Sequence, residues 1–171
     1  ATVYQKLYQR NPVRIYERNR FGGVWEPFTR AYLQNNILGT VSQSGGVPTG
    51  AAFEEVDNAT GFALKLPGGF MLSISTRTIS DFSGAGTFAS PYRRGMPVSF
   101  PVTFSSLPEI MLSAKSSDTS AGGRYILASY RDGTLSVDDL SADMALMGDS
   151  DPTAASAVWT VTVIAIGRWF E

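Results

Sequence analysis

The last stretch of the chain, AVWTVTVIAIGRWF (residues 157–170), decides the fold class because its side chains alternate with a period of two. That period is typical of a β-strand, whereas a helix repeats every 3.6 residues. From Val163 onward both faces are apolar, which predicts a central strand covered on both sides. One face carries Trp159, Val161, Val163 and Ala165, and the other carries Thr160, Thr162, Ile164 and Ile166.

The same reading extends along the rest of the chain and predicts an antiparallel β-sandwich of about seven to nine strands. The N-terminal hairpin should turn near Gly22–Gly23, and Pro27 marks an edge or a bulge. Residues 80–97 are expected to form a long irregular loop, and residues 142–147 a helical turn. The other expected strands are VRIYERNR (13–20), VWEPFTRAYL (24–33), GFALKL (61–66), FMLSISTRTI (70–79), VSFPVTF (98–104), LPEIMLSAK (107–115), RYILASY (124–130) and TLSVDDL (134–140).

The segment NNILGTVSQSGGVPTGA (35–51) carries neither a charge nor an aromatic side chain. Its glycines and proline interrupt any regular element. The composition fits either a flexible linker or an ordered strap that a partner holds in place. Three segments are therefore expected: an N-terminal β-hairpin at 1–36, an extended strap or linker at 37–60, and a β-sandwich at 61–171.

The composition excludes several kinds of chemistry. The chain contains no cysteine and no histidine, so disulfides, thiolate metal sites and a Ser-His-Asp triad are impossible. Residues 1–36 carry a net charge of +4. A basic segment can indicate nucleic-acid binding, but here arginines alternate with aromatic residues, which favours a solvated sheet face. No run is apolar enough for a membrane helix.

Several motifs resemble the C-terminal receptor-binding module of phage and prophage-type tail fibres. ILGTVSQSGGVPTGA (37–51) followed by GFALKLPGGFMLSIS (61–75) resembles a segment common in those fibres. SFPVTFSSLPEIMLSAK (99–115) and WTVTVIAIGRW (159–169) resemble the rest of the module. RIYERNRFGGVWEPFTRAYLQNN (14–36) resembles the end of a knob-like fibre repeat. The PGG turn departs from the charged Asp-Gly turn of the common form.

The resemblance implies an all-β homotrimer with an H-type-lectin-like sandwich that belongs to a virion or phage-like particle. Such a fibre or spike tip recognises bacterial surface glycan, capsule or lipopolysaccharide, by multivalent non-covalent binding. The alternative is a structural fibre or adaptor segment that trimerises and docks onto other particle proteins through its N-terminal segment. No cofactor, nucleic acid or membrane insertion is expected, and further residues are expected before Ala1.

Two groups of residues are candidates for binding sites. Tyr92, Arg93 and Arg94, in the expected loop, and Trp169, near the end of the chain, combine ring faces with guanidinium groups that suit acidic glycans. The competing interpretation is ordinary packing at the edge of the core. A weaker hypothesis is calcium binding by aspartates, whose spacing does not match an EF-hand. These are Asp138, Asp139, Asp149 and Asp151, with Asp143 nearby.

Catalysis is not expected. A glycosidase needs two carboxylates about 5–9.5 Å apart across a cleft. The available carboxylates are Glu54, Glu55, Asp57 and Glu109, and nothing in the sequence places any two of them in that way.

Overall fold

The computed structural model describes residues 2–11, 13–79, 87, 92–116, 125–130, 134–147 and 159–170. Their regular structure consists of β-strands in antiparallel ladders, which confirms the predicted fold class. In these ranges no helix is long and apolar enough to span a membrane. The homotrimer stays a prediction. The strands are β1 (Val3–Arg10), β2 (Val13–Phe21), β3 (Val24–Trp25), β4 (Thr29–Arg30), β5 (Gln43–Ser44), β6 (Val47–Pro48), β7 (Glu54–Asn58), β8 (Gly61–Lys65), β9 (Phe70–Ile79), β10 (Tyr92–Ser99), β11 (Glu109–Ser116), β12 (Tyr125–Tyr130), β13 (Asp139–Met147) and β14 (Trp159–Arg168).

The chain divides into two compact units, Ala1–Glu54 and Glu55–Glu171. The three-segment division inferred from the sequence stays a prediction. In the N-terminal unit, β2 is the middle strand: it pairs with β1 along its length and with β3 and β4 on its other edge. The predicted turn at Gly22–Gly23 is confirmed, and both glycines have positive φ (57° and 87°). Two consecutive positive φ angles are those of a type I′ hairpin turn.

The uncharged segment after the hairpin is ordered by its own hydrogen bonds. β5 and β6 form a small hairpin across Gly45–Gly46, where φ is again positive at both residues. The Val41 N–H donates to the Glu54 carboxylate at 2.9 Å, and the Ala51 N–H donates to the Thr40 carbonyl at 2.9 Å. These bonds hold the segment within a single chain.

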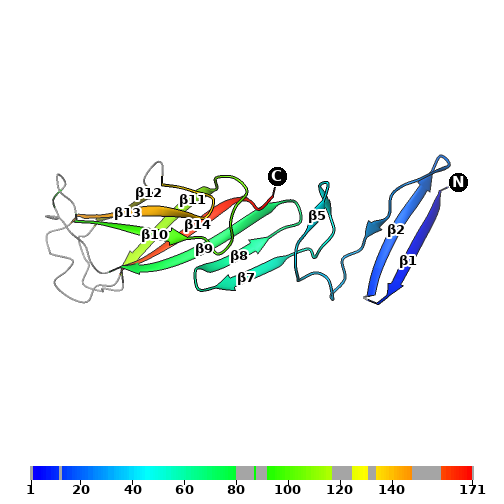
Figure 1. Ribbon diagram of the computed structural model, residues 1–171, viewed down its shortest axis with the longest axis horizontal. Coiled ribbons are helices and arrows are strands. Elements are labelled where there is room, and N and C mark those ends of the chain that lie inside the picture. Colours follow the sequence, from blue (N-terminus) through cyan, green and yellow to red (C-terminus); the bar gives the residue numbers. More distant parts are fainter. Residues whose placement is uncertain are drawn as a thin grey trace. The chain divides into compact units, whose positions relative to one another are not determined.

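The C-terminal unit is a sandwich of two sheets (Figure 1). The larger sheet has the order β11-β14-β9-β8-β7, and the smaller has the order β10-β13-β12. The last strand, β14, lies between β11 and β9, which confirms its predicted central place. All ten of its residues pair with β9, and eight of them also pair with β11.

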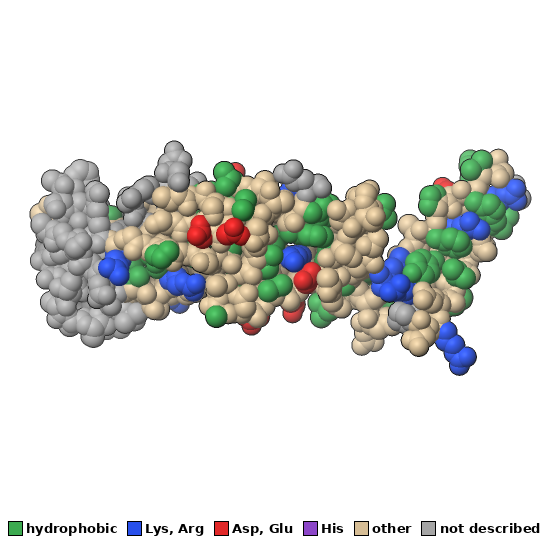
Figure 2. Space-filling model, in the orientation of Figure 1, with side chains coloured by type: hydrophobic (Ala, Val, Ile, Leu, Met, Phe, Trp, Pro, Cys, Tyr) green, Lys and Arg blue, Asp and Glu red, His purple; other side chains and the backbone are tan. Residues whose placement is uncertain are grey.

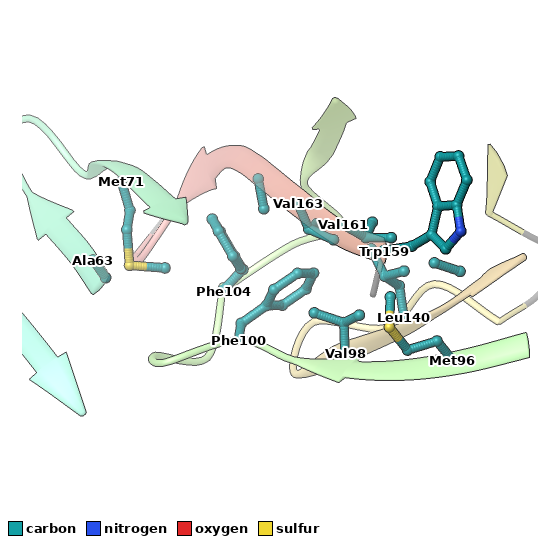
Figure 3. Close-up of a cluster of buried hydrophobic side chains, with 12 residues drawn as sticks. Ala63, Met71, Met96, Val98, Phe100, Phe104, Leu140, Trp159, Val161 and Val163 are labelled. Atoms are coloured by element: carbon teal, nitrogen blue, oxygen red, sulfur yellow. The ribbon is translucent and has the colours of Figure 1, made fainter. Parts of the chain in front are cut away.

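The hydrophobic core lies between these two sheets (Figure 3). The inner face of β14 is buried, while its outer face is half-buried, so within one chain the strand is covered on one side and not on both as predicted. The smaller sheet and the segment after β10 supply the opposing side chains. The buried apolar residues are Ala63, Met71, Met96, Val98, Phe100, Phe104, Leu140, Ala142, Trp159, Val161, Val163 and Ala165.

Three predicted elements differ from the structure. The strand expected at 98–104 ends at Ser99, because Pro101 has no N–H for a ladder; Phe100 and Phe104 instead donate to the carbonyls of Asp138 and Val137. The helical turn expected at 142–147 is part of β13, which pairs with β10 on one edge and β12 on the other. Non-local pairing overrides the helical propensity of its Ala, Leu and Met residues. Of the strand expected at 134–140, only Asp139 and Leu140 are extended, within β13.

Replacing Gly61 with alanine is expected to destabilise the C-terminal unit by at least about 2 kcal/mol. Gly61 has φ of 144°, and an added Cβ would overlap the Ile74 carbonyl oxygen and press on Ser75. Gly68→Ala is the matched control, because a Cβ there meets nothing within 4 Å. Urea unfolding of both variants checks this, and equal midpoints would contradict it.

Candidate functional site

The sequence-predicted glycan residues do not come together. Tyr92, Arg93 and Arg94 begin strand β10, so the prediction that they lie in a loop is wrong. Arg94 is exposed, whereas the side chains of Tyr92 and Arg93 lie outside the described residues. Strand β10 begins at the end of the sandwich where β9 ends, beside Ile79 and its partner Trp159 (Figure 1). Arg168, which precedes Trp169, pairs with Phe70 at the other end of β9. Arg94 therefore lies at the end remote from Trp169.

Trp169 is half-buried and contacts the turn between β8 and β9. Its indole N–H donates to the Leu66 carbonyl at 2.8 Å, and its backbone N–H donates to the Gly69 carbonyl at 2.9 Å. The Phe170 ring packs edge-to-face on it, with centroids 4.4 Å apart, and the Lys65 ammonium lies 5.7 Å from its ring centroid. These contacts fasten the β8–β9 turn to the end of the chain; glycan binding by Trp169 stays a prediction.

The aspartates proposed for calcium are used locally where they are described. Asp138 is exposed and is hydrogen-bonded to the Thr103 hydroxyl, and the Ser136 hydroxyl donates to Asp139 at 2.7 Å. Asp149 and Asp151 lie outside the described residues, as does the side chain of Asp143. Within the described part of the chain, no three acidic side chains gather as a metal site requires.

A pocket of about 520 Å³ lies on the N-terminal unit, where the sequence analysis placed no site. Its base includes Tyr16 of β2 and Arg30 of β4, which are direct cross-strand partners. The Arg30 guanidinium donates from Nη1 to the carbonyls of Thr49 and Gly50, at 2.8 and 3.0 Å, and so ties the segment after β6 to the sheet. The lining residues are Arg14, Tyr16, Phe28, Thr29, Arg30, Tyr32, Val47, Pro48 and Thr49.

The same face of the hairpin carries stacked arginines beyond the pocket. Arg18 lies between Trp25 and Phe28, with its guanidinium carbon 4.3 Å from each ring centroid, and its Nε donates to Gln5 at 2.7 Å. Such stacking holds a cation in place without neutralising it. The alternation of arginine and aromatic residues in the sequence predicted a solvated sheet face and not the edge of a pocket. Figure 2 shows basic and apolar side chains interspersed on this unit.

The opposite face of the hairpin carries an ion pair between Lys6 and Glu17, 2.9 Å apart on neighbouring strands. The hydrogen bond from Lys6, with a smaller one from Tyr4, holds the pKa of Glu17 below its ordinary value. The same bond raises the pKa of Lys6. Both side chains are exposed, so solvent screens the pair.

The pKa shift of Glu17 predicts the direction of a pH effect. Because this pKa is lowered on folding, the pair stabilises the hairpin above the unfolded-state pKa, and this contribution is lost as the pH falls through the folded-state pKa. An NMR titration of the Glu17 carboxyl carbon is expected to show a midpoint that rises in Lys6→Met. An unchanged midpoint in that variant would show that Lys6 is not the cause.

A second surface is the outer face of the larger sheet. Rows of directly paired residues cross it from β11 to β8, for example Met111, Ile164, Ile74 and Phe62. None of the apolar side chains on this face is buried within one chain. We call it the apolar outer face; it consists of Phe62, Leu64, Leu72, Ile74, Met111, Ile164 and Ile166.

Comparisons with known proteins show a distant structural likeness. No protein-family model matches the sequence, and no curated protein matches it. The R1 pyocin fibre of P. aeruginosa is similar at 14% identity with a TM-score of 0.40, over 98% of this chain and 54% of that one. An N-truncated R1-type pyocin tail fibre (13%, 0.39) matches over 66% and 84%, and an R2-type one (14%, 0.40) over 95% and 77%. This chain thus spans about half the length of the first of these structures.

Proposed function

We propose that the chain is part of a phage-like tail fibre or spike that associates as a homotrimer and recognises bacterial surface polysaccharide. The observation that carries the proposal is how little the N-terminal unit buries by itself. Among the described residues of this unit, Asn36, Val41 and Ala51 are the buried ones. Large apolar side chains are exposed on both faces of the β1–β2 hairpin, including Leu7 and Tyr8.

A hairpin of this kind is at best marginally stable in water, because it lacks a covered apolar face. A unit of 54 residues also buries a small share of its surface when it folds alone. Association with sister chains supplies the missing contacts, both here and over the apolar outer face. The number three comes from the tail-fibre resemblance of residues 37–51, 61–75 and 159–169.

In a trimer, weak sites are presented in three copies, and avidity replaces the need for a single tight site. The activity is binding and not catalysis. Placement in a tail fibre, outside the cell during attachment, follows from the same proposal. Tyr92, Arg93 and Arg94 remain candidate glycan contacts on the C-terminal unit, and Trp169 is a further candidate there.

Binding of the purified chain to an array of capsular polysaccharides and lipopolysaccharides tests the proposal. We expect saturable binding to a subset of the glycans, and stronger binding when they are immobilised at high density. Absence of binding to any glycan, together with tight binding to another particle protein, would favour the adaptor alternative, in which the N-terminal segment docks onto the particle.

A further inference from the structure

The pocket on the N-terminal unit has the composition of a site for an acidic sugar. Its volume of about 520 Å³ lies within the range of small-molecule sites. Arg14 and Arg30 are the charged residues that line it, and no acidic residue does. Glu17, the acidic residue of β2, projects from the opposite face of the strand and pairs with Lys6.

Both arginines retain hydrogen-bonding capacity for a ligand. Arg30 Nε is buried and has no hydrogen-bond partner among the described residues, although Nη1 is used on Thr49 and Gly50. An unsatisfied buried donor costs free energy, which an anionic acceptor would recover. The Arg14 side chain makes no ion pair or hydrogen bond within the described part of the chain, and the fork of a guanidinium matches a carboxylate.

The remaining lining suits a sugar ring better than a bare anion. Tyr16, Phe28 and Tyr32 contribute aromatic surface, and Phe28 and Tyr32 are exposed in the folded chain. Aromatic faces pack against the apolar C–H surface of a ring, while tyrosine hydroxyls and the backbone near Thr49 offer hydrogen bonds. Phe28 is held in place by Arg18, which stacks on its ring at 4.3 Å.

The pocket is also formed in advance of binding. The two bonds from Arg30 fix residues 49 and 50, and the Gly45–Gly46 turn fixes the β5–β6 hairpin that carries Val47 and Pro48. A site that is ordered before binding avoids part of the entropy cost of recognition.

We propose that the pocket lined by Arg14, Tyr16, Phe28, Arg30 and Tyr32 binds a carboxylated sugar unit of an acidic polysaccharide. The proposal rests on the function proposed above, which supplies the source of the sugar. It places this binding site on the N-terminal unit, separate from the candidate residues on the C-terminal unit. The guanidinium groups take the carboxylate, and the aromatic residues take the ring.

The test is titration of the full chain with sodium glucuronate, followed by NMR, with glucose and inorganic phosphate as comparison ligands. We expect glucuronate to bind, and glucose and phosphate to bind at least ten-fold more weakly. Arg14→Gln and Tyr32→Ala should each weaken glucuronate binding about ten-fold, since one charge-assisted bond or one stacked ring is worth roughly that much. Arg10→Gln and Tyr8→Ala, on the other face of the hairpin, are the matched controls and should leave it unchanged.

Several results would overturn the proposal. These are equal binding of glucose or phosphate, no binding of glucuronate, or binding that Arg14→Gln and Tyr32→Ala leave intact. If the unaltered chain binds no glucuronate and these two variants change the oligomeric mass, a sister chain fills the pocket instead. If polysaccharide binding on the array persists in both variants, the pocket fails while the proposed function stands; if the unaltered chain binds no polysaccharide, the proposed function fails.

Discussion

Replacing Met111 with lysine is expected to convert the proposed trimer into monomers at micromolar concentration. Met111 lies on the apolar outer face and is 60% exposed within one chain, so lysine is tolerated there by the folded monomer. In an assembly that buries this face, each copy loses about 2 kcal/mol of apolar burial and also places a charge against its neighbour. Three copies act together, so the loss is multiplied across the assembly. Gel filtration coupled to light scattering measures the molar mass of the assembly, which is three times 18.4 kDa for a trimer.

Leu107→Lys is the control for this variant. Leu107 is 63% exposed, lies in the same unit just before β11, and is outside the apolar outer face. The same introduction of charge should leave the proposed trimer intact at this position. Two outcomes would contradict the interpretation: a monomeric unaltered chain would remove the proposed trimer, and a trimer that tolerates Met111→Lys would place its interface elsewhere.

Truncating Leu140 to alanine is expected to lower the free energy of unfolding of the C-terminal unit by about 3 kcal/mol. Leu140 is 1% exposed, on strand β13, directly opposite Val98 of β10. Alanine leaves a cavity between the two sheets, because the side chains around it are held by paired strands on both sides and cannot close in. Such a loss is a large share of the stability of an ordinary domain.

Leu107→Ala removes the same atoms from an exposed position and should cost less than about 0.5 kcal/mol. Urea unfolding of both variants, followed by the fluorescence of the buried Trp159, gives the comparison. Equal losses would mean that Leu140 does not lie in the core. Because Leu140 is remote in the chain from Val98, the comparison also checks the β10–β13 pairing, which the sequence did not predict.

Local periodicity was enough to place several strands along the chain. β2, β8, β9 and β14 agree with their predicted positions, because alternation and glycine turns act within a few residues. Gly22–Gly23 connects β2 to β3 in a tight turn, as the pair of glycines indicated. Long-range pairing gave the errors: β10 occupies residues 92–97 of the segment expected as a loop, and β13 replaces the expected helical turn.

For the candidate sites too, the sequence indicated local arrangements but not contacts between distant segments. Arg14, Tyr16 and Arg18 fall in the strand predicted at 13–20, where side chains two residues apart point the same way. That Arg30 closes a pocket by bonding to Thr49 and Gly50 could not be foreseen, since the partners lie 19 and 20 residues away.

By itself, the sequence determined that the chain is built of strands, where several of its hairpins turn, and that no thiol or imidazole chemistry is possible. The tertiary structure alone decided which strands are neighbours, and therefore which face of β14 is buried and which stays open. The physical reason is that alternation and turn geometry are properties of adjacent residues, whereas burial and pocket shape depend on contacts between segments far apart in the chain.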